Sequence, residues 1–123
     1  MSRSNLEALA VDIYEWCEDN NLWGDCIIYF DGKAWSDYFN WNGEDSTHID
    51  HNLYEYDGKN PLDYFEYANP DTLSMSFEGA LNYVLNSYCG DWVRLEEEFE
   101  SLFENHGYYF EMGDSWNLSA YEI

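Results

Sequence analysis

Closely spaced carboxylates are the feature of this sequence that points most directly to chemistry. They are densest in a run made of Glu96, Glu97, Glu98, Glu100 and Glu104. If this segment is helical, Glu97, Glu100 and Glu104 lie three and four residues apart and share one face. Neighbouring Cβ atoms on such a face are about 5–6 Å apart, which resembles the spacing of successive phosphates on one DNA strand. Carboxylates held in this way can form charge-assisted hydrogen bonds with lysine and arginine side chains.

A second acid row is predicted near the N-terminus, where Asp12, Glu15 and Asp19 have the same spacing. Like charges at this spacing destabilise an isolated helix by about 0.2–0.5 kcal/mol per pair. A solvated helix face is the simpler explanation of either row. It explains less well why lysine and arginine are so scarce throughout the chain, and we therefore predict that the two rows contact a partner. The predicted contact residues are Glu96, Glu97, Glu100, Glu104, Asp12, Glu15 and Asp19.

The net charge extends this prediction from two helices to the whole surface. The 123 residues include 26 Asp and Glu but only 4 Lys and Arg, which gives a formal net charge of -22. Such a surface repels nucleic acid and anionic lipid, so we expect no direct binding of DNA or of membranes. The expected partner is a strongly basic protein. Adaptation to saturated brine is an alternative source of an acidic surface, and the abundance of bulky aromatic residues argues against it.

Metal binding is an alternative centred on His48 and His51, with Asp45 and Asp50 close by in the sequence. Histidine is a common zinc ligand, but this spacing matches no established zinc motif and is more typical of exposed imidazoles. The sequence contains no nucleophile elbow, no glycine-rich phosphate loop and no His-Glu-x-x-His motif. We therefore expect no cofactor and no enzymatic activity. A small metal protein or enzyme built on the two histidines is the alternative.

Aromatic residues predict a folded core in spite of the charge. They make up 20% of the chain, whereas disordered acidic chains contain few of them. Burying one Phe side chain contributes about 1.5–3 kcal/mol. Tyr54 and Tyr56 lie in a polar stretch and are candidates both for core packing and for contact with a partner.

The sequence predicts a cytoplasmic location. Its N-terminal residues do not form a signal peptide, and no apolar run approaches the roughly 20 residues of a membrane span. Cys17, Cys26 and Cys89 are an odd number without Cys-x-x-Cys spacing, so we expect reduced thiols.

Three helices are predicted from the apolar periodicity. The first carries the N-terminal acid row and begins at a capping box formed by Ser4 and Glu7. The second spans residues 80–88. The third begins near Trp92 and ends before Gly107, which occupies the position of a C-terminal cap.

Strands are predicted between these helices and after them. Residues 26–30 and 33–39 flank Asp31-Gly32, which suits a two-residue type I′ turn. Alternating apolar residues predict a half-buried strand over 73–77. A C-terminal hairpin is expected over 108–122, with Gly113-Asp114 as a type II′ turn.

The stretch from 43 to 71 has no clear period and is rich in tyrosine. A turn at Asn42-Gly43 could introduce a third strand, but we predict a packed, irregular segment with one short helix near 62–67. The whole chain, 1–123, is therefore expected to be a single α+β domain. Its sheet is mostly antiparallel, with about three helices packed on one face.

In size, charge and helix-borne acid rows, the chain resembles the DNA-mimic inhibitor proteins of phages and mobile elements, which include antirestriction and anti-CRISPR proteins. The resemblance covers the composition of the whole chain and the row formed by Glu97, Glu100 and Glu104. It implies an inhibitor, monomeric or homodimeric, that acts in the cytoplasm of a bacterial host cell. Its partner would be a basic nucleic-acid-binding protein, a CRISPR effector or a restriction enzyme, whose basic groove it occupies. An immunity protein that neutralises a basic toxin or nuclease is the alternative, because it would use the same electrostatics.

Overall fold

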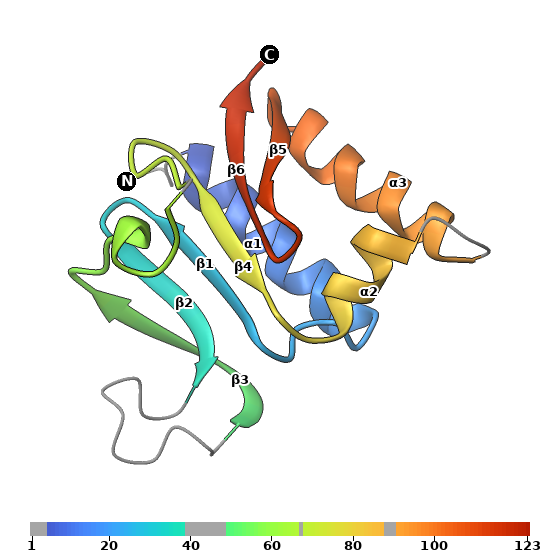
Figure 1. Cartoon of the computed structure of the whole chain (residues 1–123), viewed down its shortest axis with the longest axis horizontal. Coiled ribbons are helices and arrows are strands. Elements are labelled where there is room, and N and C mark those ends of the chain that lie inside the picture. The colour runs from blue at the N-terminus through green and yellow to red at the C-terminus, as the bar shows by residue number, and fades with distance from the viewer. Residues whose placement is uncertain (1–4, 39–48, 67, 88–90) are drawn as a thin grey trace.

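The computed structural model describes residues 5–38, 49–66, 68–87 and 91–123. These residues form three α-helices, one short 3-10 helix and a six-stranded antiparallel sheet, so the predicted α+β class is confirmed. The strand order is β3-β2-β1-β4-β6-β5 (Figure 1). In chain order the elements are α1 (Asn5–Asp19), β1 (Cys26–Phe30), β2 (Lys33–Tyr38), β3 (Ile49–Asp57), η1 (Pro61–Asp63), β4 (Ser74–Phe77), α2 (Ala80–Ser87), α3 (Asp91–Glu104), β5 (Tyr108–Asp114) and β6 (Asn117–Glu122).

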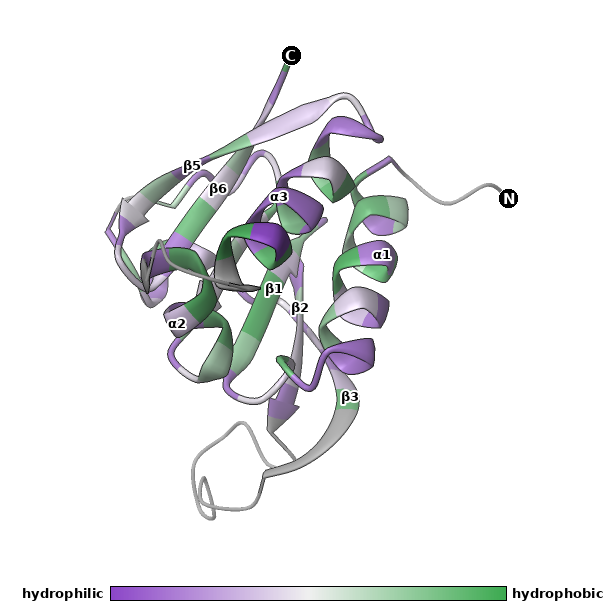
Figure 2. Ribbon diagram, turned by 90° about the vertical axis from the view of Figure 1, so that its right-hand side faces the viewer, coloured by the Kyte–Doolittle hydropathy of each residue, from purple (hydrophilic) through white to green (hydrophobic). Residues whose placement is uncertain are grey.

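The three helices pack on the same face of the sheet, as predicted. Side chains alternate along β1, so that Cys26, Ile28 and Phe30 point to this face. They share one buried cluster with Met75 and Phe77 of β4 and with residues of all three helices. In Figure 2 the helices lie in front of β1 and β2. The helical members of the cluster are Leu9, Ala10, Ile13, Cys17, Leu81, Val84, Leu85, Phe99 and Phe103.

The opposite face of the sheet is covered by the chain between β3 and β4. Phe65 in this segment packs edge-on against Tyr29 of β1, with ring centroids 6.0 Å apart. Ser74 and Ser119 point to the same face, and their hydroxyl oxygens are 2.8 Å apart. Both hydroxyls accept a hydrogen bond from the backbone N–H of Asn69. β4 is therefore buried on both faces, and the prediction of a half-buried strand is wrong. The alternation of residues within a strand cannot show that a segment distant in sequence covers its polar face.

Two of the predicted backbone signals are confirmed by positive φ angles. Asp31 and Gly32 have φ values of 52° and 76°, as a type I′ turn requires at both central positions. Gly107 follows α3 with a φ of 82°, the left-handed conformation of a helix C-terminal cap.

The C-terminal hairpin is present, but its predicted turn is wrong. Asp114 pairs with Asn117, so the two-residue turn is at 115–116, and Gly113 lies at a bulge without a positive φ. Asp114 and Asn117 exchange two hydrogen bonds of 3.1 Å across the turn. Trp116 packs against the segment that covers the opposite face. These contacts place the turn two residues beyond the glycine.

The prediction of an irregular segment over 43–71 is wrong for residues 49–57, which form β3. This strand pairs with β2 at residues 54–57 and at Ile49, with a register shift between them, and it places Leu53 against the helical core. Pairing with β2 fixes these residues as a strand, although their own polar sequence does not predict one. The predicted short helix at 62–67 is instead the single 3-10 turn η1, which Asn60 caps by accepting a hydrogen bond from the N–H of Leu62 at 2.9 Å.

Several predicted features lie outside the described residues: the Ser4 cap, the Asn42-Gly43 turn and Cys89. Among the residues that the structure does describe, no helix has both the length and the apolar character needed to cross a membrane.

Gly79 provides a test of the junction between β4 and α2. A Cβ atom at this position would lie 2.5 Å from the backbone oxygen of Gly24, too close for either backbone to accommodate without movement. Gly79→Ala should therefore lower the free energy of unfolding by about 1–3 kcal/mol in urea denaturation. Gly32→Asn is the control, since the space around Gly32 is open and Asn tolerates a positive φ. Equal urea midpoints for Gly79→Ala and the unmodified protein would contradict the close approach.

Candidate protein-binding surface

Helix α3 is fixed to the rest of the fold by a cluster of aromatic rings. Phe99 and Phe103 are completely buried, and their ring centroids are 5.2 Å apart. Phe110 of β5 contacts both rings, at 5.4 and 4.9 Å, and Trp16 of α1 lies 5.4 Å from Phe99. The apolar side of α3 is therefore packed between α1 and β5, and its polar side is presented on a rigid element.

Four of the predicted contact residues gather on that polar side, and we refer to Glu96, Glu97, Glu100 and Glu104 as the α3 acid row. Partial burial raises the pKa of Glu100, and the charges of Glu96, Glu104 and Glu97 raise it further. Among the described residues, no lysine, arginine or histidine forms an ion pair with a member of this row. The row is a site of concentrated negative charge that the described fold does not neutralise.

Glu98 belongs to the same helix but has a different role. Its carboxylate accepts hydrogen bonds from the indole N–H of Trp16 at 3.1 Å and from Arg94 at 3.4 Å. The first of these bonds joins α3 to α1, and the second lies within α3. Glu98 therefore supports the helix pair, whereas the α3 acid row is presented away from it.

The N-terminal acid row is less uniform than its spacing predicts. Asp12 lies 2.6 Å from the Nε2 atom of His106, an interaction that connects α1 to the turn after α3. Glu15 and Asp19 are exposed. Burial raises the pKa of the Tyr14 hydroxyl, and the charges of Glu18 and Glu15 raise it further. A partner contact by this row stays a prediction.

Tyr54 and Tyr56 lie on the other side of the molecule from the helices. They pair with Ser36 and Ala34 of β2, and Ala34 belongs to the cluster on the opposite face. Directly paired residues in antiparallel strands share a face, so both tyrosines point away from α3. Both are half-buried. The structure therefore separates them from the α3 acid row, and one flat interface could not include both.

The described cations are engaged within the fold. Lys33 lies 3.6 Å from a carboxylate oxygen of Glu7 and 3.5 Å from one of Glu55, and its ammonium is 5.0 Å from the ring centre of Phe30. Arg94 forms its ion pair with Glu98, four residues along the same helix. These two cations are thus paired with other acids, and neither forms an ion pair with a member of the α3 acid row.

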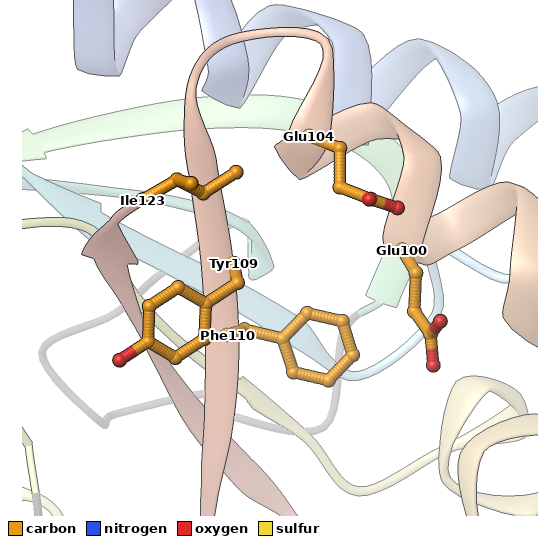
Figure 3. A pocket seen from close by; sticks show the side chains of 5 residues that line it. All are labelled: Glu100, Glu104, Tyr109, Phe110 and Ile123. Atoms are coloured by element: carbon orange, nitrogen blue, oxygen red, sulfur yellow. The ribbon is translucent and has the colours of Figure 1, made fainter.

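A hollow of about 320 Å³ adjoins the α3 acid row, and the sequence did not predict it. Glu100 and Glu104 line the hollow from α3, and Tyr109 and Phe110 line it from β5 (Figure 3). Ile123 completes the lining. The predicted C-terminal hairpin contained two of these residues, but sequence periodicity does not show which strand lies beside which helix.

The histidine-centred alternative falls largely outside the described residues, which exclude His48 and the side chain of His51. Among the described side chains, no group of three or more His, Cys, Asp or Glu is arranged to hold a metal ion. Cys17 and Cys26 are buried free cysteines. Burial raises the pKa of Cys26, and the neighbouring Cys17 and the charges of two nearby aspartates add to this effect, so the thiol is the stable form.

Comparison of the chain with protein-family models, with curated proteins and with solved structures finds no match.

Crowding in the α3 acid row makes a prediction about stability and pH. Because the pKa of Glu100 is higher in the folded chain than in the unfolded chain, the native state binds more protons. Folding stability therefore falls as pH rises from the usual glutamate pKa of about 4.3 through the raised value. Glu100→Gln should increase the free energy of unfolding by about 0.5 kcal/mol at pH 7, and the gain should vanish near pH 3.5.

Urea denaturation at the two pH values measures this difference. Glu111→Gln is the matched control, because it removes the same charge from an exposed position on β5. If Glu100→Gln is no more stabilising than Glu111→Gln at pH 7, repulsion within the row is too weak to matter.

Proposed function

We propose that this protein is an acidic DNA mimic that binds and inhibits a nucleic-acid-binding host-defence protein, either a CRISPR effector or a restriction enzyme. It would act by occupying the basic groove in which that protein holds DNA or RNA. On this proposal the protein is a binding inhibitor rather than an enzyme, and it needs no cofactor. The alternative of a basic toxin as the partner is distinguished by the experiment below.

The observation that carries this proposal is the α3 acid row. Nucleic-acid grooves are lined with lysine and arginine side chains placed to meet phosphates. Glu97, Glu100 and Glu104 present carboxylates at neighbouring positions of one helix face, and Glu100 is close enough to the others for their charges to raise its pKa. A cationic groove would relieve this repulsion, and this relief would add to the free energy of binding.

Rigidity supports the same proposal. Phe99 and Phe103 are buried beneath the row, so its acids lose less conformational freedom on binding than acids on a loop would. The net charge of -22 would also accelerate encounter with a basic protein, because opposite fields steer association.

Charge reversal across the row is the direct test. The purified protein is used to capture partners from lysates of bacteria that carry CRISPR or restriction systems, and captured proteins are identified by mass spectrometry. The triple variant Glu97→Lys, Glu100→Lys and Glu104→Lys should bind the captured effector at least 100-fold more weakly, about 3 kcal/mol, because three lysines would face a basic groove. The free variant should be no less stable than the unmodified protein, since the reversal removes like-charge repulsion.

The matched control reverses three exposed acids of α1 with Glu15→Lys, Glu18→Lys and Asp19→Lys. This variant has the same net charge as the α3 variant and should lose less affinity, because the acid row of α1 is the sparser of the two. Loss of binding in the α1 variant alone would move the interface to α1. Capture of a basic toxin instead of a defence protein would favour an immunity function.

A further inference from the structure

Strand β5 is an edge strand on the α3 side of the sheet. It occupies one end of the strand order, and no strand among the described residues pairs with its outer edge. An exposed strand edge presents a row of backbone N–H and C=O groups that can pair with an extended segment of another chain. The direction in which each backbone group of β5 points therefore decides what this edge can bind.

One backbone hydrogen bond fixes the direction of these groups. The N–H of Ile123 donates to the carbonyl oxygen of Gly107 at 3.0 Å, just before the first paired residues of β5 and β6. Hydrogen-bonded and non-hydrogen-bonded pairs alternate along an antiparallel ladder, so Tyr109, two residues after Gly107, also bonds to β6. The backbone groups of Phe110 and Met112 consequently point away from β6, toward the outer edge.

Strand β6 supports this assignment from its other side. Its Ala120 is directly opposite Phe110 in the register. The N–H of Ala120 donates to the carbonyl oxygen of Leu73, next to β4, at 2.8 Å. The backbone of Ala120 is thus directed toward β4, as expected if the pair that it forms with Phe110 is one of the non-hydrogen-bonded pairs.

The hollow of about 320 Å³ lies across this outer edge. Tyr109 and Ile123 line it on one side of β5, whereas Phe110 lines it on the other side together with Glu100 and Glu104 of α3 (Figure 3). A hollow that is lined from both sides of one edge strand opens in the plane of the sheet, where an added strand would lie. The shape of the surface and the direction of the backbone groups therefore indicate the same kind of ligand, an extended segment.

Acidic side chains around the edge select among extended segments. Side chains of an added strand alternate between its two sides, and those on the side of Phe110 would lie near Glu100 and Glu104. Glu111 is exposed on the other side of β5. A second copy of this chain would bring like charges together at this edge, because each copy has a formal net charge of -22. A segment with positively charged side chains complements the edge.

We propose that the outer edge of β5 binds an extended, basic segment of the partner protein as an additional antiparallel strand of the sheet. Antiparallel pairing is slightly more stable per residue than parallel pairing, and the described strands of this sheet all pair in that way. Lysine or arginine at alternate positions of the segment would lie opposite Phe110 and Met112, on the side of α3. This inference rests on the proposed function, because a nucleic-acid-binding protein would supply the basic segment.

Hydrogen exchange in the full chain, followed by NMR, tests the pairing with the peptide acetyl-Lys-Val-Lys-Val-Lys-amide. At a peptide concentration of ten times the Kd, the amides of Phe110 and Met112 should exchange about ten-fold more slowly, because the lysine residues opposite them accept their hydrogen bonds. The amides of Tyr109 and Glu111 already bond to β6, so their exchange should change little. The analogue with glutamate in place of lysine should protect none of these amides. Absence of binding, or binding that leaves exchange at Phe110 and Met112 unchanged, would overturn the proposal.

Methylation of the peptide backbone separates strand pairing from general charge attraction. N-methylation of the central lysine removes an N–H that would bond to β5 and should weaken binding about ten-fold. N-methylation of one valine changes an N–H that would point to solvent and should have little effect. A lysine-methylated peptide that binds as tightly as the valine-methylated one would rule out antiparallel pairing at this edge. Protection of the same amides in concentrated protein without peptide would show that a second copy occupies the edge, and would also overturn the proposal.

Met112→Pro distinguishes failure of the edge from failure of the proposed function. Proline removes an N–H that points away from β6, and edge strands tolerate proline at such positions. In the capture experiment this variant should weaken the complex with the effector about ten-fold, whereas its control, Met112→Leu, should not. If the unmodified protein captures its effector and Met112→Pro binds equally well, the partner does not use this edge, although the α3 acid row stands. If no nucleic-acid-binding protein is captured at all, the proposed function fails whatever the peptides show.

Discussion

Burial of Phe99 and Phe103 between α3 and the neighbouring elements is the interaction on which the rest of the structure depends. Each like-charged pair in the α3 acid row costs about 0.2–0.5 kcal/mol, whereas removal of one buried Phe side chain costs about 3–5 kcal/mol. Aromatic packing therefore exceeds the repulsion and keeps the helix docked. Phe110 extends the same cluster into β5, so the acids and the adjoining hollow share one rigid support.

The acids of this protein divide into those that connect elements and those that project from them. Glu7 and Glu55 hold Lys33, Glu98 holds Arg94, and Asp12 meets His106. Lys33 connects β2 with α1 and β3, and His106 connects the turn after α3 with α1, whereas the Arg94–Glu98 pair lies within α3. The α3 acid row supplies none of the described ion pairs, so folding alone does not account for it. On the proposed function, contact with a basic surface would account for the row.

Local patterns predicted the helices and the Asp31-Gly32 turn well, because their signals lie within a few residues of each other. Leu9, Ile13 and Cys17 mark the buried face of α1, and Asp31-Gly32 allowed one turn type. Interactions over long sequence distances were not predictable in this way. β3 is ordered by pairing with β2, the Ser115–Trp116 turn is fixed partly by packing of Trp116, and the hollow exists because β5 lies beside α3. Of the candidate site, the acid row followed from helical spacing, but the separation of Tyr54 from it required the sheet.

Competition with nucleic acid tests most directly whether this protein binds in the groove that holds DNA or RNA. The affinity of this protein for its captured effector is measured at increasing concentrations of the DNA or RNA that the effector binds, at constant ionic strength. If this protein is a DNA mimic, the apparent Kd should rise in proportion to the nucleic-acid concentration, because both ligands would occupy one basic groove. An apparent Kd that does not change, with a ternary complex of effector, nucleic acid and this protein, would contradict it.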